Sequence, residues 1–103
     1  MLIRFTPEAD LELTEAREWY SHQRDGLDAE LMDCVDEALL RVVCNPQSFP
    51  IVYRDLRRVI VRRFPFAVFY SLTSDQILVT AVFHSRRDPE LWQSRVIRGT
   101  ENE

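Results

Sequence analysis

Apolar residues recur every three or four positions in the first half of the chain. One series runs from Ala9 to Tyr20 and a second from Leu27 to Val42, with charged residues at most of the positions between. This period is typical of amphipathic helices that bury one face. We therefore predict two helices joined by a short link, an arrangement that favours an antiparallel helical hairpin.

The residues that flank the two series set the helix boundaries. Thr6 can cap the first helix, and Pro7 suits its first position, where no backbone N–H is needed. We expect this helix to end near Gln23. The second helix should stop before Pro46, because the residue that precedes a proline avoids helical geometry.

The remaining segments are rich in β-branched and aromatic residues, which are typical of strands. One predicted strand precedes the first helix and three follow the second: Leu2–Phe5, Arg57–Phe64, Phe66–Leu72 and Ile77–Phe83. We expect the last three to form an antiparallel meander. A further helix is predicted from Asp88-Pro89-Glu90 into Leu91–Val96.

The element order is therefore β-α-α-β-β-β-α. Helices early and strands late indicate an α+β fold, with the helical hairpin packed on one face of a small antiparallel sheet. A chain of 103 residues is near the usual size of one hydrophobic core, so we expect a single domain over residues 1–103.

Composition removes several classes of site. Only two glycines are present, which excludes a P-loop and a dinucleotide fingerprint, and the absence of lysine excludes a Schiff-base lysine. The cysteines Cys34 and Cys44 and the histidines His22 and His84 lack the paired spacing of a metal site. We expect two buried thiols, no metal and no cofactor.

The sequence carries no sign of a membrane. Charges begin at Arg4 and Glu8, so no cleavable apolar leader opens the chain, and the longest apolar runs, near Val79–Phe83, are too short to span a bilayer. We therefore expect a cytoplasmic protein with no membrane partner.

Charge is divided unevenly between the halves. The net charge is -4, but residues 1–50 hold 11 acids against 4 arginines, a balance of -7, whereas residues 51–103 hold 6 acids against 9 arginines, a balance of +3. Such asymmetry suggests a charged partner for one half.

The candidate chemistry lies in the basic half. His84 is its only side chain with a near-neutral reference pKa, and arginine suits bidentate contact with phosphate. A ribonuclease without metal needs a base, cations for the developing charge and an acid. His84 could be the acid or base, and Tyr70 or Glu90 a second proton-transfer group. The cations could be Arg62, Arg63, Arg86 and Arg87.

A structural interpretation accounts for the same residues. Asp88 would cap the last helix, Arg86 or Arg87 would pair with a neighbouring acid, and Trp92 would pack on the sheet. For any single residue this is the stronger interpretation. The adjacent Trp19 and Tyr20 present a similar choice, because two neighbouring aromatic residues cannot point the same way from a helix. One should enter the core, and the other could lie where a partner docks.

Taken together, the pattern resembles the RelE/ParE superfamily of bacterial type II toxins, also called plasmid-stabilisation proteins. The resemblance spans roughly Phe5 to Arg95 and rests on four local matches in order. They are Pro7-Glu8-Ala9-Asp10-Leu11, Trp19-Tyr20, Arg63-Phe64-Pro65-Phe66 with Val68 and Tyr70, and His84-Ser85-Arg86-Arg87-Asp88-Pro89 with Trp92.

The resemblance implies a growth-inhibiting toxin that is encoded beside an antitoxin, which binds and neutralises it. RelE-like members are ribosome-dependent endonucleases that cut mRNA, and ParE-like members inhibit DNA gyrase without nuclease activity. If the chain is RelE-like, and hence a metal-independent endoribonuclease, the implied catalytic residues are His84, Arg62, Arg86 and Arg87. The implied target-facing residues are Arg58, Arg63, Tyr70 and Trp92.

Two departures favour the ParE-like interpretation. A strand position that is arginine in RelE falls on Ala67, and the tyrosine near the RelE C-terminus is replaced by Trp92, which cannot transfer a proton. The long acidic hairpin with Trp19-Tyr20 also looks ParE-like. An inactive toxin-like binding module is the third interpretation.

The antitoxin should find an apolar surface on the hairpin. We expect this surface around Trp19, Tyr20 and Leu40. We also expect the antitoxin to bring acidic side chains to the arginine-rich half, because burying arginines without counter-charges is costly.

Overall fold

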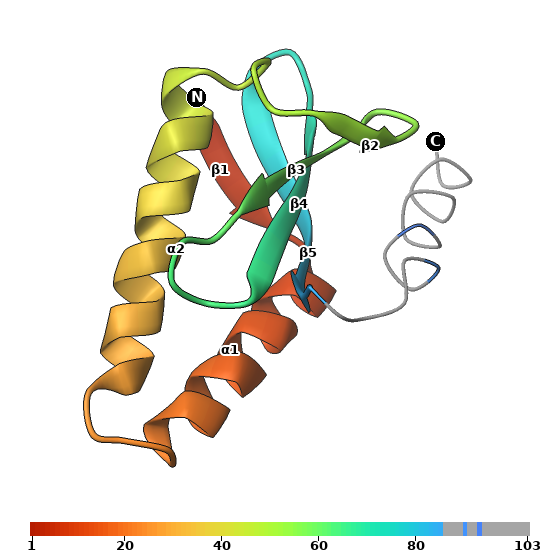
Figure 1. Cartoon of the computed structure of the whole chain (residues 1–103). Coiled ribbons are helices and arrows are strands. Elements are labelled where there is room, and N and C mark those ends of the chain that lie inside the picture. The colour runs from red at the N-terminus through yellow and green to blue at the C-terminus, as the bar shows by residue number, and fades with distance from the viewer. Residues whose placement is uncertain (86–89, 91–92, 94–103) are drawn as a thin grey trace.

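The computed structural model describes residues 1–85, 90 and 93 of the 103-residue chain. Figure 1 shows a helical hairpin beside a twisted sheet, with the closed end of the hairpin pointing away from the strands. The elements in chain order are β1 (Leu2–Phe5), α1 (Pro7–Ser21), α2 (Leu27–Cys44), β2 (Ile51–Tyr53), β3 (Leu56–Ile60), β4 (Phe66–Leu72) and β5 (Gln76–His84).

The strands form one five-stranded sheet in the order β1-β5-β4-β3-β2. The predicted meander is confirmed, because β3, β4 and β5 pair antiparallel. The sheet as a whole is mixed and not purely antiparallel, since β1 pairs with β5 in parallel. The chain achieves this parallel pairing by sending both helices and three strands between the two partners.

Local sequence explains where the hairpin begins and turns. The Thr6 side chain accepts a hydrogen bond from the backbone N–H of Ala9 at 3.2 Å, and Pro7 occupies the first helical position of α1. Between the helices, Gly26 adopts φ 83° as the residue before α2, a conformation that costs glycine little. The start of α1 and both ends of α2 match the prediction, whereas α1 ends two residues earlier than expected, at Ser21.

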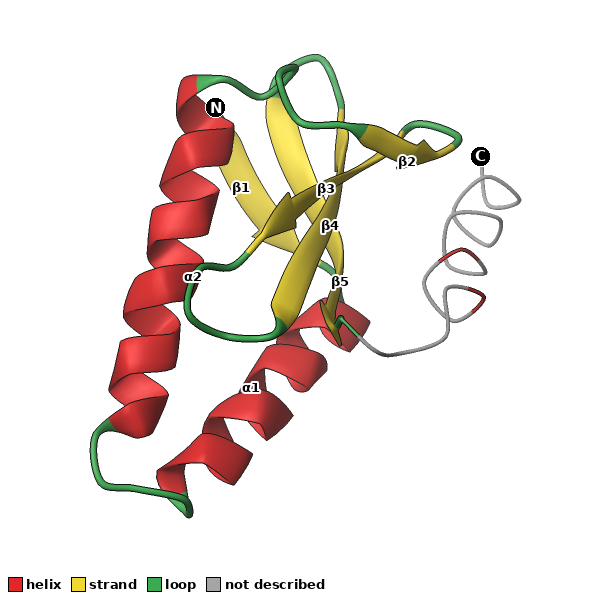
Figure 2. Ribbon diagram, viewed as in Figure 1, coloured by secondary structure: helices red, strands yellow, loops and turns green. Residues whose placement is uncertain are grey.

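Each face of the sheet carries its own apolar cluster. The larger cluster joins the inner faces of both helices to one face of the sheet, through residues such as Val35, Val59 and Val68. The smaller cluster lies on the opposite face and, among the described residues, includes no helical residue: its buried members are Leu56, Ala67, Phe69, Ala81 and Phe83. The helices α1 and α2 therefore cover the same face of the sheet (Figure 2), which confirms the predicted α+β layering.

The strands β2 and β3 differ from the prediction, and most of the predicted last helix lies outside the described residues. The strand β2 was not predicted, and β3 ends at Ile60 and not at Phe64, because Arg63 takes a positive φ of 71° that breaks the extended backbone. The predicted last helix, from Asp88 into Leu91–Val96, lies outside the described residues apart from Glu90 and Gln93.

Candidate functional site

Carboxylates of α2 hold several of the arginines that the sequence singled out. Glu30 accepts hydrogen bonds from Arg24 at 2.8 Å and from Arg63 at 2.9 Å, one through each carboxylate oxygen. The bond from Arg24, followed by that from Arg63, holds the pKa of the Glu30 carboxyl below its ordinary value. Glu30 therefore fastens the loop between β3 and β4 to the start of α2.

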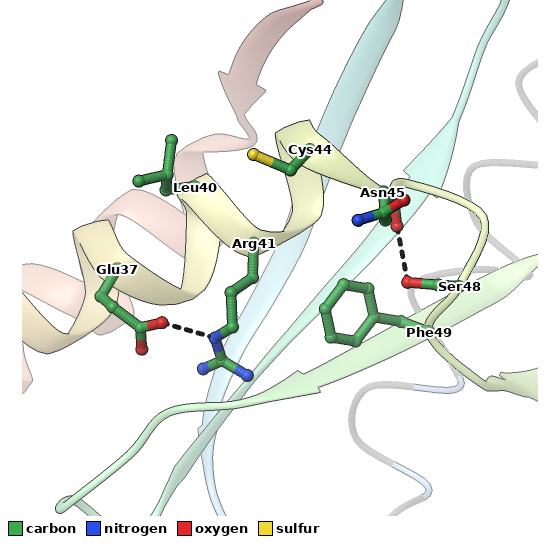
Figure 3. Close-up of a pocket in the computed structure, with 7 residues that line it drawn as sticks. All are labelled: Glu37, Leu40, Arg41, Cys44, Asn45, Ser48 and Phe49. Atoms are coloured by element: carbon green, nitrogen blue, oxygen red, sulfur yellow. Dashed lines mark hydrogen bonds and ion pairs between the residues drawn. The ribbon is translucent and has the colours of Figure 1, made fainter.

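A second carboxylate repeats this arrangement seven residues, or about two helical turns, further along α2. Glu37 lies 2.8 Å from Nε of Arg41 and 3.4 Å from Arg62, and Arg41 also donates to the carbonyl oxygen of Ile60 at 2.9 Å. The Arg41 side chain runs from α2 towards the sheet, as Figure 3 shows. Both Arg62 and Arg63 remain about two-thirds exposed, so a partner could still reach them.

The two arginines within β3 face opposite sides of the sheet. Arg57 stands across from Tyr70 on the helix side and donates to the backbone oxygens of Gln47 and Phe49. Arg58 stands across from Phe69 on the other side, and its Nε is buried without a hydrogen-bond partner in the described part of the chain. Arg57 thus secures the loop after α2, and Arg58 is the β3 arginine that reaches the outer face.

Tyr70 does not face a target in this structure. Its side chain is fully buried in the larger cluster, and its hydroxyl donates to the carbonyl oxygen of Pro46 at 2.9 Å. Burial raises the pKa of the Tyr70 hydroxyl, and the nearby Arg57 opposes that rise. The target-facing role predicted for Tyr70 is corrected accordingly: it ties β4 to the segment after α2.

His84 ends β5 on the helix side of the sheet. Its ring stands 5.4 Å from that of Phe66, edge to face, and the residue is half-buried. Arg58 lies on the opposite face of the sheet from His84, whereas Arg57 lies on the same face as His84. Of the other residues predicted in this stretch, Arg86, Arg87 and Trp92 lie outside the described residues.

The adjacent aromatic residues of α1 divide as predicted. Tyr20 packs into the larger cluster, edge to face with Phe64 at 5.1 Å between ring centroids, whereas Trp19 is 58% exposed. Trp19 leans against Tyr20 with its ring perpendicular, at 4.9 Å. Tryptophan is enriched among the residues that dominate binding interfaces, and Trp19 is both exposed and supported by a partly buried neighbour.

Leu40 is also exposed, at 62%, but it does not belong to the same patch as Trp19. It lies thirteen residues after the start of α2, or about 20 Å along the helix, whereas Trp19 lies beside the closed end of the hairpin. The apolar surface predicted for the antitoxin is therefore two surfaces, one at each end of the hairpin.

A hollow of about 350 Å³ borders Leu40 at the end of α2 (Figure 3). Its lining includes Phe49, Cys44 and the Glu37–Arg41 ion pair. Cys44 is exposed and Cys34 is half-buried, both as free thiols, so the prediction of two buried thiols is wrong for Cys44. Cys44 sits in the last turn of α2, outside the row of residues that enters the core.

The sequence did not identify the residues that organise the arginines. Glu30 and Glu37 stand seven positions apart on α2, two full helical turns, which places them on one side of the helix. This seven-residue spacing is visible in the sequence. The arginine partners are not, because Arg62 lies 25 residues from Glu37 and Arg63 lies 33 residues from Glu30, and only the fold brings them together.

Among residues 1–85, 90 and 93, no group of three or more His, Cys, Asp or Glu side chains is positioned to hold a metal ion. None of the described helices combines the length and apolarity needed to cross a membrane.

Comparison with known proteins places this fold. The family model described as "ParE toxin of type II toxin-antitoxin system, parDE" matches residues 3–89. A solved structure titled "Chromosomal ParDE TA system from P. aeruginosa" superposes with a TM-score of 0.67 at 17% identity, covering 82% of this chain and 95% of that one. No curated protein matches the sequence.

Proposed function

Because the chain belongs to the ParE toxin family of type II toxin-antitoxin systems, we propose that it arrests bacterial growth by blocking DNA gyrase. A cognate antitoxin neutralises it, and both events take place in the cytoplasm. The proposal keeps the ParE-like interpretation of the sequence ahead of the RelE-like one.

One observation carries the choice of gyrase over mRNA. The described residues proposed for ribonuclease chemistry are not all available to one substrate. Tyr70 is buried, Arg58 and His84 lie on opposite faces of the sheet, and Arg62 is paired with Glu37. Acid-base catalysis requires its groups within hydrogen-bond reach of one substrate. A toxin that acts by binding needs no such convergence.

Binding of gyrase would use the arginines that remain accessible. Arg58 is partly exposed on the face of the sheet opposite α1 and α2, and Arg63 is about two-thirds exposed on the neighbouring loop. Arginine is enriched among the residues that dominate protein interfaces. We therefore expect Arg58 and Arg63 to contact the target, as Trp92 is also predicted to do.

The test is a gyrase supercoiling assay with the purified protein. We expect relaxed plasmid to stay relaxed in its presence, and Arg58→Gln to raise the inhibitory concentration at least about tenfold. Arg4→Gln, an exposed arginine on β1 at the far edge of the sheet, serves as the matched control and should inhibit like the wild type.

A parallel assay on translating ribosomes decides the alternatives. Unaltered supercoiling together with mRNA cleavage that His84→Ala or Arg87→Ala suppresses would establish the RelE-like endonuclease. Unaltered supercoiling with intact mRNA would leave a toxin-like binding module without inhibitory activity.

A further inference from the structure

A second hollow lies between the two helices and the first strand. It measures about 220 Å³, and its lining is almost entirely apolar. The apolar side chains come from three elements: Phe5 of β1, Leu13 of α1, and Met32, Val35 and Leu39 of α2. Since Leu13 and Val35 belong to the buried core, the floor of this hollow is firmly packed. We call it the interhelical groove.

Each bank of the interhelical groove carries one exposed carboxylate. Asp10 stands on the α1 side and Asp36 on the α2 side. Within the part of the chain that the structure describes, neither carboxylate forms an ion pair. The hairpin around them is strongly acidic, because residues 7–44 hold 11 acidic side chains against 3 arginines, a balance of -8. The groove is thus an apolar slot in a negative field.

This charge distribution differs from that around the arginine cluster. Glu30 and Glu37 already supply counter-charges to Arg62 and Arg63, so an incoming acidic segment would have to compete with carboxylates of the same chain. Asp10 and Asp36 have no such partners among the residues that the structure describes. An incoming positive charge would therefore gain more at the groove than a negative charge would gain at the arginines.

From these observations we propose that the interhelical groove binds a basic, apolar segment of the antitoxin. One large apolar side chain of that segment fills the groove, and lysine or arginine side chains on either side of it meet Asp10 and Asp36. This inference rests on the proposed function for the existence of an antitoxin. It concerns a different surface from the arginine-rich half, to which the antitoxin is expected to bring acidic side chains.

The test uses the purified antitoxin, taken as the product of the short reading frame beside this gene. Its affinity for this chain is measured by titration calorimetry with the variant Asp10→Arg/Asp36→Arg. The matched control is Glu15→Arg/Asp33→Arg, which changes the net charge equally at exposed positions outside the groove. We expect the groove variant to weaken binding at least about tenfold and the control to weaken it less than about threefold.

Equal weakening by both variants would overturn the proposal, because it would show a general effect of charge on binding. Unchanged binding by the groove variant would overturn it as well. Thermal unfolding checks that each variant folds. If the arginine variant does not fold, the same titration is made with Asp10→Asn/Asp36→Asn, which preserves side-chain size. Growth inhibition by the uncomplexed wild type is measured separately. Its absence would reject the toxin assignment without deciding where the segment binds.

Discussion

Single carboxylates on α2 decide how the arginines of this protein are displayed. Glu30 and Glu37 each engage two arginine side chains, one from their own helical region and one from the loop between β3 and β4. The arrangement limits the conformations of Arg62 and Arg63 without burying them. Exposed pairs of this kind add little stability individually. Their main consequence is that a flexible basic loop is held in one position.

The Glu30 pair predicts a specific dependence of stability on pH. The Glu30 pKa is lower in the folded than in the unfolded protein, so its stabilising effect is present above the unfolded pKa and is lost as pH falls through the folded value. The free energy of unfolding should therefore fall less on acidification for Glu30→Gln than for the wild type. Urea unfolding at neutral pH and at about pH 3 measures this.

The control for the Glu30 prediction is Glu15→Gln, an exposed carboxylate on α1. Its free energy of unfolding should follow that of the wild type at both pH values. A difference between wild type and Glu30→Gln that stays constant over this range would contradict the prediction.

Individual residues were the hardest level to predict from the sequence. The family resemblance makes Tyr70 a candidate target contact, yet strand alternation turns it into the core, where its hydroxyl donates a hydrogen bond to the carbonyl oxygen of Pro46. The prediction that only one of Trp19 and Tyr20 enters the core is confirmed, because helical geometry alone makes neighbouring side chains point in different directions. The face that a residue occupies could be predicted only where local periodicity determined it.

At the scale of elements, one side chain joins the start of α1 to the sheet. Thr6 accepts the N–H of Ala9 and also donates to the carbonyl oxygen of Thr80 in β5 at 3.4 Å. Thr80 lies where the pairing of β4 with β5 shifts register. Thr6 thus combines a helix cap with a link between α1 and β5.

Loss of the Thr6 hydroxyl should destabilise the fold measurably. We expect Thr6→Ala to lower the free energy of unfolding by about 1 kcal/mol, the usual cost of losing a helix cap. Thr6→Ser keeps the hydroxyl and should retain most of the stability. Chemical denaturation of the three proteins checks this, and equal losses for serine and alanine would show that the methyl group matters and the cap does not.

Element boundaries were predictable where local signals were strong. Pro7, Pro46 and the aromatic run of β4 placed three of them. The strand β2 was missed because three residues are too few to show alternation, and because Pro50 before it and Arg54 after it, at φ 54°, read as turn. The parallel partner of β1 was not predictable, since nothing in a four-residue strand specifies a neighbour more than 70 residues away.

At the scale of the whole molecule, the charge asymmetry of the sequence becomes spatial only in part. The acidic excess lies on the helical hairpin, where Arg62 and Arg63 pair with carboxylates of α2, whereas Arg58 lies on the opposite face of the sheet. A partner for the hairpin and a target for the other face could thus bind different surfaces. This layout is consistent with a toxin that an antitoxin restrains from one side.

The central claim is that this chain is a toxin, and growth under induced expression tests it most directly. We predict that induction alone arrests growth in a bacterial host, and that co-expression of the adjacent antitoxin gene restores it, because the antitoxin engages the toxin stoichiometrically. Normal growth despite abundant, folded protein after induction alone would contradict the account.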